Sequence, residues 1–265
     1  MTDATLHDGS RIDLVIRGSG PTVLLTVNPV PSVGDKADEL RRWGVDPELG
    51  AKLVDALAGT FRVVAFDYEG HVLAEPKSDT LTPDTIAADI LAVADAAGAD
   101  TFAYYGYSWL ALNGLQLAIR TDRLTALAMG GFPPIGGPYA EMLAVTLATH
   151  DMSARSVPDV GLSEPVTRQF VTLYQALTGF DDRSVRPAIT CPRLCFVGSA
   201  DRIAYDERWG GVTVDIAGAT VANRAELTAA GWDVRVLDGL DHTQAMQPDN
   251  VLPVLRPWLV EHVGT

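Results

Sequence analysis

A serine at position 108 stands where a strand-like segment meets a helix-like one. Residues 101–105 are largely aromatic, as is typical of a strand, whereas residues 111–120 are rich in leucine and alanine, as is typical of a helix. A serine held on such a sharp turn has an exposed hydroxyl group beside the N–H groups that open the helix. This arrangement is suited to attack on an acyl carbon and to binding of the oxyanion that results.

The residues around this serine depart at one position from the Gly-x-Ser-x-Gly pattern that such turns usually carry. Leu110 stands where the second glycine, which lets the helix pack closely, is expected. Ala111 and Gly114 keep the rest of that helix face small, so we expect a modest shift of the helix to accommodate the leucine. Ser108 as an ordinary helix N-cap, without catalytic chemistry, remains the alternative interpretation.

A carboxylate and a histidine follow two later strands. Asp201 comes soon after an apolar segment at residues 194–197, and His242 follows another at residues 234–237. Because serine is a weak nucleophile at its ordinary pKa, an imidazole must accept its proton, and a carboxylate must orient the imidazole and stabilise its charged form. The chain thus carries, in order, the three groups that acyl transfer needs. Asp206 is the alternative acid.

Buried strands alternate with helices along most of the chain. We expect strands at residues 12–17, 22–27, 61–66, 101–105, 124–129, 194–197 and 234–237, and helices at residues 48–57, 82–98, 111–120 and 251–263. Such alternation predicts an α/β fold with a doubly wound, mainly parallel sheet. Binding sites in these sheets lie beyond the carboxyl ends of the strands, which is where the serine, the aspartate and the histidine stand.

Several segments together resemble the α/β-hydrolase superfamily over nearly the whole length of the chain. Residues 67–71 look like its Asp-x-x-Gly-His stretch, residues 190–203 are similar to its strand and Gly-x-x-Asp acid segment, and residues 239–242 resemble its histidine loop. The acid and histidine segments are specific only in combination. The resemblance implies the α/β-hydrolase fold and a serine hydrolase of a divergent branch.

The resemblance also implies a role for each candidate residue. Ser108 would be the nucleophile, Asp201 the acid and His242 the base. The backbone N–H groups of Trp109 and Val30 would donate to the oxyanion. No cofactor and no metal ion is implied.

The loop after the first buried strand differs from the family. Where the family commonly has His-Gly, this chain has Asn28 and Pro29, and proline has no N–H group to donate. Val30 can still donate, so the second oxyanion contact depends on it. Asn28, Pro29 and Tyr107 are expected to line the substrate pocket. Tyr107 and Trp109 could equally pack in the core.

Residues 133–187 show a less regular pattern, with Pro-Pro and Gly-Gly pairs and short helical pieces. The resemblance implies that this segment is a small cap inserted over the pocket. The α/β-hydrolase core would then comprise residues 1–132 and 188–265.

The composition narrows the range of partners. The 34 acidic and 20 basic side chains give a formal net charge of −14, which repels nucleic acid and anionic membranes. The chain shows no signal peptide and no apolar run long enough to span a membrane. Its two cysteines, Cys191 and Cys195, would lie too far apart in a strand to form a disulfide. We therefore expect a cytoplasmic protein that acts on a small molecule, while the oligomeric state, including a homodimer, stays open.

The predicted function is cleavage of a carboxylic ester, thioester or lactone through an acyl-enzyme on Ser108. One alternative uses the same three residues for acid and base chemistry in a carbon–carbon cleavage, an elimination or a cyclisation of a small metabolite. The altered loop at residues 28–31 favours that alternative, because it weakens the oxyanion site. A further alternative is a ligand-binding protein without turnover, which the departure at Leu110 favours.

Overall fold

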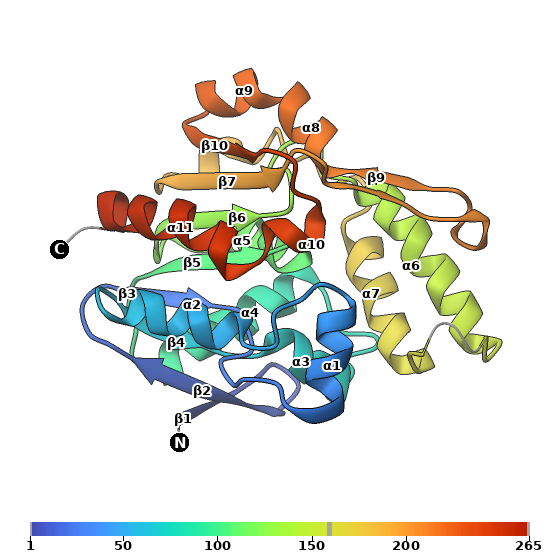
Figure 1. Cartoon of the computed structure of the whole chain (residues 1–265), viewed down its shortest axis with the longest axis horizontal. Helices are drawn as coiled ribbons and strands as arrows, with labels where there is room; N and C mark the ends of the chain where they lie inside the picture. Colours follow the sequence, from blue (N-terminus) through green and yellow to red (C-terminus); the bar gives the residue numbers. More distant parts are fainter. Residues whose placement is uncertain (1, 158–160, 264–265) are drawn as a thin grey trace.

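Eight strands form a mainly parallel sheet in a computed structural model that describes residues 2–157 and 161–263 (Figure 1). They are β1 (Thr2–Thr5), β2 (Arg11–Arg17), β3 (Thr22–Leu25), β4 (Arg62–Ala65), β5 (Phe102–Tyr107), β6 (Leu124–Gly130), β7 (Arg193–Gly198) and β10 (Trp232–Leu237). Their order across the sheet is β1-β2-β4-β3-β5-β6-β7-β10, with β2 antiparallel to both neighbours and the other pairs parallel. The predicted fold class, a doubly wound and mainly parallel α/β sheet, is confirmed.

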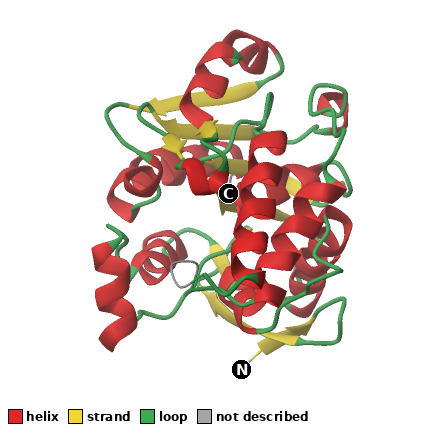
Figure 2. Ribbon diagram, turned by 90° about the vertical axis from the view of Figure 1, so that its right-hand side faces the viewer, coloured by secondary structure: helices red, strands yellow, loops and turns green. Residues whose placement is uncertain are grey.

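Helices lie on both sides of the strands (Figure 2). Two long helices pack on each face, in the pairs α2 (Leu49–Ala58) with α11 (Pro248–Val263), and α4 (Pro83–Ala96) with α5 (Trp109–Ala118). The strands supply side chains alternately to the two faces, because successive side chains of a strand point in opposite directions. In β5, Tyr104 is buried in the cluster with α4 and α5, whereas Tyr105 is buried in the cluster with α2 and α11.

Two helices, α6 (Tyr139–Ala154) and α7 (Glu164–Ala176), occupy the segment in which a cap was expected. They pack against each other beside the carboxyl ends of the parallel strands (Figure 1). A small two-stranded sheet of β8 (Arg202–Ala204) and β9 (Thr213–Asp215) lies against α6 but comes from a later part of the chain, outside residues 133–187. The elements beside this end of the sheet therefore include β8 and β9 in addition to the segment at residues 133–187 that the sequence indicated.

The remaining elements are short. They are α1 (Gly34–Arg42), α3 (Tyr68–Ala74), α8 (Ile216–Ala222), α9 (Arg224–Ala229), α10 (His242–Ala245) and two 3₁₀ turns, Arg186–Ala188 and Glu207–Trp209. Within residues 2–157 and 161–263, no helix combines the length and the apolar composition that a membrane crossing requires.

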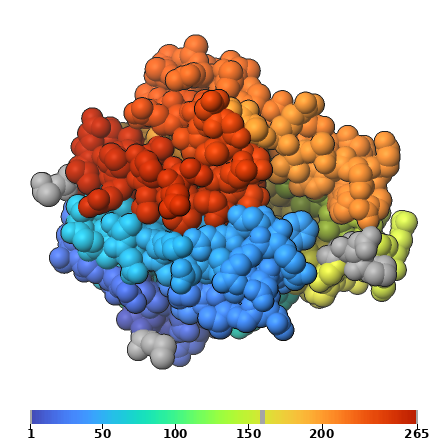
Figure 3. Space-filling view, viewed as in Figure 1, coloured from blue at the N-terminus to red at the C-terminus, as the bar shows by residue number. Residues whose placement is uncertain are grey.

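Segments far apart in the sequence meet on the face that Figure 3 shows, where part of the blue-to-cyan N-terminal region lies against the red C-terminal helices. Helix α2 packs against α11. In addition, the N–H of Asp46 donates to Oε1 of Gln247, with a distance of 2.9 Å between the two atoms. The segment between β3 and α2 is thereby held beside the turn that follows α10.

Candidate active site

Ser108 is held on a sharp turn between β5 and α5. Its φ angle of 56° and ψ angle of −128° lie in a region that residues other than glycine rarely adopt. Its N–H donates to the carbonyl of Gly130 (2.8 Å), and its own carbonyl accepts the N–H groups of Ala111 (2.9 Å) and Leu112 (3.1 Å). These bonds hold a backbone conformation that costs about 1–3 kcal/mol when it is unsupported.

Two glycines make this turn possible. A Cβ atom at Gly106 would lie 2.5 Å from the carbonyl oxygen of Leu110, and one at Gly114 would lie 2.6 Å from the ring of Tyr104. Both distances are far below van der Waals contact, so glycine at each position lets α5 approach β5 this closely. As expected from the sequence, Gly114 keeps the buried face of the helix small.

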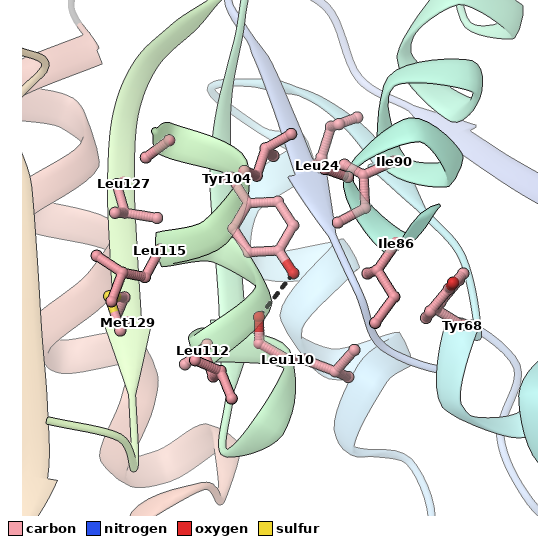
Figure 4. Close-up of a cluster of buried hydrophobic side chains, with 14 of the residues drawn as sticks. Leu24, Tyr68, Ile86, Ile90, Tyr104, Leu110, Leu112, Leu115, Leu127 and Met129 are labelled. Atoms are coloured by element: carbon pink, nitrogen blue, oxygen red, sulfur yellow. Dashed lines mark hydrogen bonds between the residues drawn. The ribbon is translucent and has the colours of Figure 1, made fainter. Parts of the chain in front are cut away.

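Leu110, which replaces the usual second glycine, is accommodated in the core. Its side chain is 6% exposed and points towards Ile86 and Tyr68 (Figure 4). Its carbonyl oxygen accepts the hydroxyl group of Tyr104 (2.9 Å), the bond drawn as a dashed line in Figure 4. The leucine therefore leaves the turn intact and adds apolar contact between α5, α3 and α4.

Ser108, Asp201 and His242 lie in one hydrogen-bonded series. The Oγ atom of Ser108 is 3.1 Å from Nε2 of His242, and Nδ1 of His242 is 2.9 Å from Oδ2 of Asp201 and 3.1 Å from its Oδ1. Asp201 is fully buried, and the His242 side chain is 21% exposed. A buried carboxylate that accepts from Nδ1 leaves Nε2 free to accept the serine proton. The structure thus brings together the three residues that the sequence singled out.

The loop after β7 holds Asp201 in this position. Its N–H donates to the carbonyl of Gly198 (3.2 Å), and its carbonyl accepts the N–H of Ala217 (2.9 Å). Asp206, the alternative acid, lies elsewhere: it accepts the N–H of Arg208 (2.9 Å) at the start of a 3₁₀ turn, and its side chain is 53% exposed. The carboxylate that meets the histidine is therefore that of Asp201.

His242 opens the short helix α10. The side chain of Asp241 accepts the N–H of Gln244 (2.8 Å), and the side chain of Gln244 accepts the N–H of Asp241 (3.0 Å), which completes a capping box. The Tyr107 hydroxyl donates to the carbonyl of His242 (2.8 Å), and the centres of the two rings lie 5.2 Å apart. Burial raises the pKa of Tyr107, so its hydroxyl stays protonated and remains a donor. Tyr107 thus fixes the backbone of His242 from β5.

The N–H groups near Ser108 differ from the expectation at one position. The N–H of Trp109 opens α5 and has no acceptor within the described residues. The N–H of Val30, in contrast, donates to Oδ1 of Asn28 (2.9 Å), and Val30 is 60% exposed. The N–H of Val30, which the family resemblance assigns to the oxyanion, is therefore bonded within its own loop in this structure, and its role as a donor stays a prediction.

Asn28 lines a cavity together with Ser108 and Trp109, whereas Val30 does not. The N–H of Asn28 has no acceptor in the described part of the chain. Helix α2 comes very close to this residue, since a Cβ atom at Gly50 would lie 1.9 Å from the carbonyl oxygen of Asn28. The glycine therefore sets the position of the Asn28 backbone.

Two cavities meet at Ser108. The α7-side cavity, of about 320 Å³, is lined by parts of α6, α7, β8 and β9, and the α1-side cavity, of about 440 Å³, is lined by the loop after β3, by α1 and by the start of α2. Both cavities share four lining residues, Glu69, Ser108, Trp109 and His242. Of the three residues expected in the pocket, Asn28 and Tyr107 line the α1-side cavity, whereas Pro29 lines neither cavity.

Glu69 is a site residue that the sequence analysis did not identify. It lies in the first turn of α3, just past β4, and its side chain is exposed to the two cavities. Its Oε1 atom accepts Nε1–H of Trp109 (3.0 Å). Partial desolvation by the surrounding protein raises the pKa of Glu69, although the side chain stays open to the cavities. The hydrogen bond from Trp109 opposes this rise, and the charge of Asp67 adds to it. The available sequence signal was its position just past a strand, which it shares with Ser108.

Comparisons with known proteins identify the fold. No protein-family model matches the chain, and no curated protein matches its sequence. Among solved structures, an esterase from Thermogutta terrifontis is 18% identical, with 98% of both chains covered and a TM-score of 0.60. An α/β hydrolase from Sphaerobacter thermophilus (22% identical, TM-score 0.58) and an enol-lactonase from Burkholderia xenovorans (18% identical, TM-score 0.61) each align over 97% of this chain and 99% of their own. The chain therefore has the α/β-hydrolase fold that the resemblance implied.

Proposed function

We propose that this chain hydrolyses a carboxylic ester, thioester or lactone of a small molecule through an acyl-enzyme on Ser108. The observation that carries the proposal is the hydrogen-bonded series of Ser108, His242 and Asp201, with 3.1 Å between Oγ and Nε2. That series adjoins two cavities of a size that suits a small organic molecule. Two proteins of similar fold are an esterase and an enol-lactonase, which agrees with acyl transfer.

The reaction begins with attack of Oγ of Ser108 on the substrate carbonyl carbon, while Nε2 of His242 accepts the serine proton. Asp201, which is buried and bonded to Nδ1, holds the tautomer and stabilises the imidazolium that forms. His242 then donates this proton to the leaving group, and the acyl group remains on Ser108. A water molecule that gives its proton to His242 attacks the acyl group and releases the carboxylic acid and the free serine.

Two backbone N–H groups, those of Trp109 and Asn28, are proposed to bind the oxyanion. Neither group has an acceptor within the described residues, and both residues line the α1-side cavity beside Ser108. Loss of one such donor typically lowers kcat by about 10²–10³-fold. Asn28 therefore takes the role that the family resemblance implied for Val30.

The two cavities are proposed to hold the two sides of the scissile bond. The α7-side cavity has mainly apolar and aromatic walls, which include Met142, Phe170 and Tyr174. The α1-side cavity is more polar, since its walls include Lys36 and Asp46. Helices α6 and α7 together with β8 and β9 then act as the cap over the substrate, and the cavity volumes limit that substrate to a small molecule.

The two alternative functions are less well supported by this geometry. The acid–base alternative depended on a weakened oxyanion site at residues 28–31, whereas the N–H of Asn28 is available as a second donor. The non-catalytic alternative requires a serine that is not activated, which contrasts with the 3.1 Å contact between Ser108 and His242. Acyl hydrolysis is therefore the function that the site supports best.

A fluorophosphonate probe tests the proposal directly. We expect an adduct on Ser108 of the wild-type protein, located by peptide mass spectrometry, and no adduct on a Ser108→Ala variant whose folding is checked by circular dichroism. Hydrolysis of para-nitrophenyl butyrate by the wild-type protein, and not by the variant, would then follow. A folded wild-type protein that carries no adduct would exclude an activated serine, and with it the acyl-enzyme.

A further inference from the structure

The proposed acyl transfer does not require Glu69, although this residue adjoins Ser108 in both cavities. Its position is set by the start of α3, where the side chain of Asp67 accepts the N–H of Gly70 (2.8 Å). A Cβ atom at Gly70 would lie 2.3 Å from Oδ2 of Asp67, so glycine allows this tight cap. The chain therefore holds a carboxyl group beside the nucleophile in a defined orientation.

Glu69 has spare capacity for a ligand. Its Oε1 atom accepts the Trp109 indole N–H, while its Oε2 atom accepts no hydrogen bond from the described residues. No lysine, arginine or histidine of residues 2–157 and 161–263 forms an ion pair with it. Among the described residues that line the α7-side cavity, Glu69 is the sole one with a carboxyl group, and none is a lysine or an arginine. The charge of Glu69 is thus not paired with a lysine or an arginine among the described residues of this cavity.

The walls of the same cavity are rich in aromatic rings. They belong to Trp109, Phe132, Phe170, Tyr174 and Tyr205. The rings of Trp109 and Phe170 meet edge to face, with 5.4 Å between their centres. Aromatic faces attract organic cations, and a nearby carboxylate adds charge attraction. A group that is both cationic and apolar at its surface fits these walls better than a neutral or anionic group.

We propose that Glu69 is a specificity-determining residue that selects acyl substrates carrying an organic ammonium group, with this group seated in the α7-side cavity. The inference rests on the proposed function, since it concerns the substrate that Ser108 attacks. A cation bound beside Glu69 offsets the partial desolvation of its carboxylate. The formal net charge of −14 also favours the approach of cationic substrates.

Paired substrates provide the test. Butyrylthiocholine carries a trimethylammonium group, and its uncharged isostere has a tert-butyl group in that place. We expect kcat/KM of the wild-type enzyme to favour the cation by about tenfold or more, which corresponds to about 1.4 kcal/mol. A Glu69→Gln variant removes the charge but keeps an oxygen that can accept the Trp109 indole N–H. In this variant we expect the ratio of the two kcat/KM values to fall towards one, mainly through KM.

Glu75 provides a matched control. It is exposed at the end of the same helix and lines neither cavity. The Glu75→Gln variant makes the same chemical change, and we expect it to retain the wild-type preference for the cation. Equal kcat/KM values for the two substrates in the wild-type enzyme, or an unchanged ratio in Glu69→Gln, would overturn the proposal.

A binding measurement separates this inference from the hydrolase itself. Benzyltrimethylammonium is titrated calorimetrically into the Ser108→Ala variant and into the Ser108→Ala, Glu69→Gln double variant. Binding of benzyltrimethylammonium to the Ser108→Ala variant, with an affinity about tenfold lower in the double variant, would support the ammonium site. This result would hold even if the wild-type protein hydrolysed no ester. If uncharged esters are hydrolysed but benzyltrimethylammonium does not bind, the proposed function stands and the ammonium site is wrong.

Discussion

The two sides of the site are held by very different contacts. One side, which we call the enclosed side, is the turn between β5 and α5, or elbow, that carries Ser108. There, backbone hydrogen bonds link Ser108 to β6 and α5, and Gly106 and Leu110 fit against each other without free space. On the other side, which we call the open side, the loop of Asn28 and Val30 is partly exposed. One side-chain hydrogen bond and the close approach of α2 hold that loop in place.

This difference separates two tasks that the proposed acyl transfer requires. The enclosed side fixes the nucleophile and its proton acceptor, whose alignment must be maintained within fractions of an ångström. The open side forms part of the wall of the α1-side cavity and holds the N–H group that we propose as the second oxyanion donor. We therefore expect changes on the enclosed side to damage folding or chemistry severely, and changes on the open side to alter the rate by small factors.

The largest expected effect comes from Asp201→Asn on the enclosed side. An amide at this position would donate to Nδ1 of His242 and would favour the tautomer with its proton on Nε2, which cannot accept the proton of Ser108. We expect kcat/KM for para-nitrophenyl butyrate to fall by about 10⁴-fold, with the fold retained by circular dichroism.

Asp206→Asn is the matched control for this change. Asp206 is 53% exposed and paired with Arg208 at the surface, so we expect kcat/KM to stay within about twofold of the wild-type value. A loss in Asp206→Asn as large as that in Asp201→Asn would mean that the acid is not the one that the structure brings to His242.

The enclosed side was also the part that the sequence predicted well. Ser108, Asp201 and His242 each follow an apolar strand, and parallel strands end at the same edge of a sheet, so these residues had to lie near one another. The apolar character of β5 and β7 comes from burial on both faces, whereas β10 is an edge strand in which buried and more exposed residues alternate.

The open side is harder to predict from the sequence, for a physical reason. Whether the N–H of Asn28 or that of Val30 is available depends on the dihedral angles of one loop and on the approach of Gly50, and hydrophobic patterning records neither. The strands β8 and β9 have three residues each, too few for alternation to be recognised. Glu69 lies in a helix of seven residues, which is likewise too short for a clear helical period.

A Gly106→Ala variant gives the next largest effect and tests how tightly the enclosed side is packed. Its Cβ atom would lie 2.5 Å from the carbonyl oxygen of Leu110, so β5 or α5 would have to shift. We expect the free energy of unfolding in urea to fall by about 3 kcal/mol. At Gly59, where φ is −69° and nothing lies within 4 Å of a Cβ atom, alanine should leave stability unchanged or raise it by up to about 1 kcal/mol. Equal stability of the two variants would contradict the close packing of the elbow.

The smallest expected effect belongs to Asn28→Ala on the open side. The variant loses the side-chain oxygen that accepts the N–H of Val30 but keeps the Asn28 backbone N–H that we assign to the oxyanion. Loss of one hydrogen bond of about 0.5–1.5 kcal/mol loosens the loop, so we expect kcat to fall by about 3–10-fold. The free energy of unfolding should change by less than about 1 kcal/mol, because the loop is partly exposed.

The direction of this small effect distinguishes the two candidate oxyanion donors. In the wild-type protein, the Asn28 side chain occupies the N–H of Val30, and Asn28→Ala frees that N–H. If the N–H of Val30 were the donor in the reaction, its release would therefore raise kcat. If the N–H of Asn28 is the donor, the loop loses order and kcat falls. Val30→Ala keeps every N–H and trims only an exposed side chain, so we expect its kcat to match that of the wild-type enzyme.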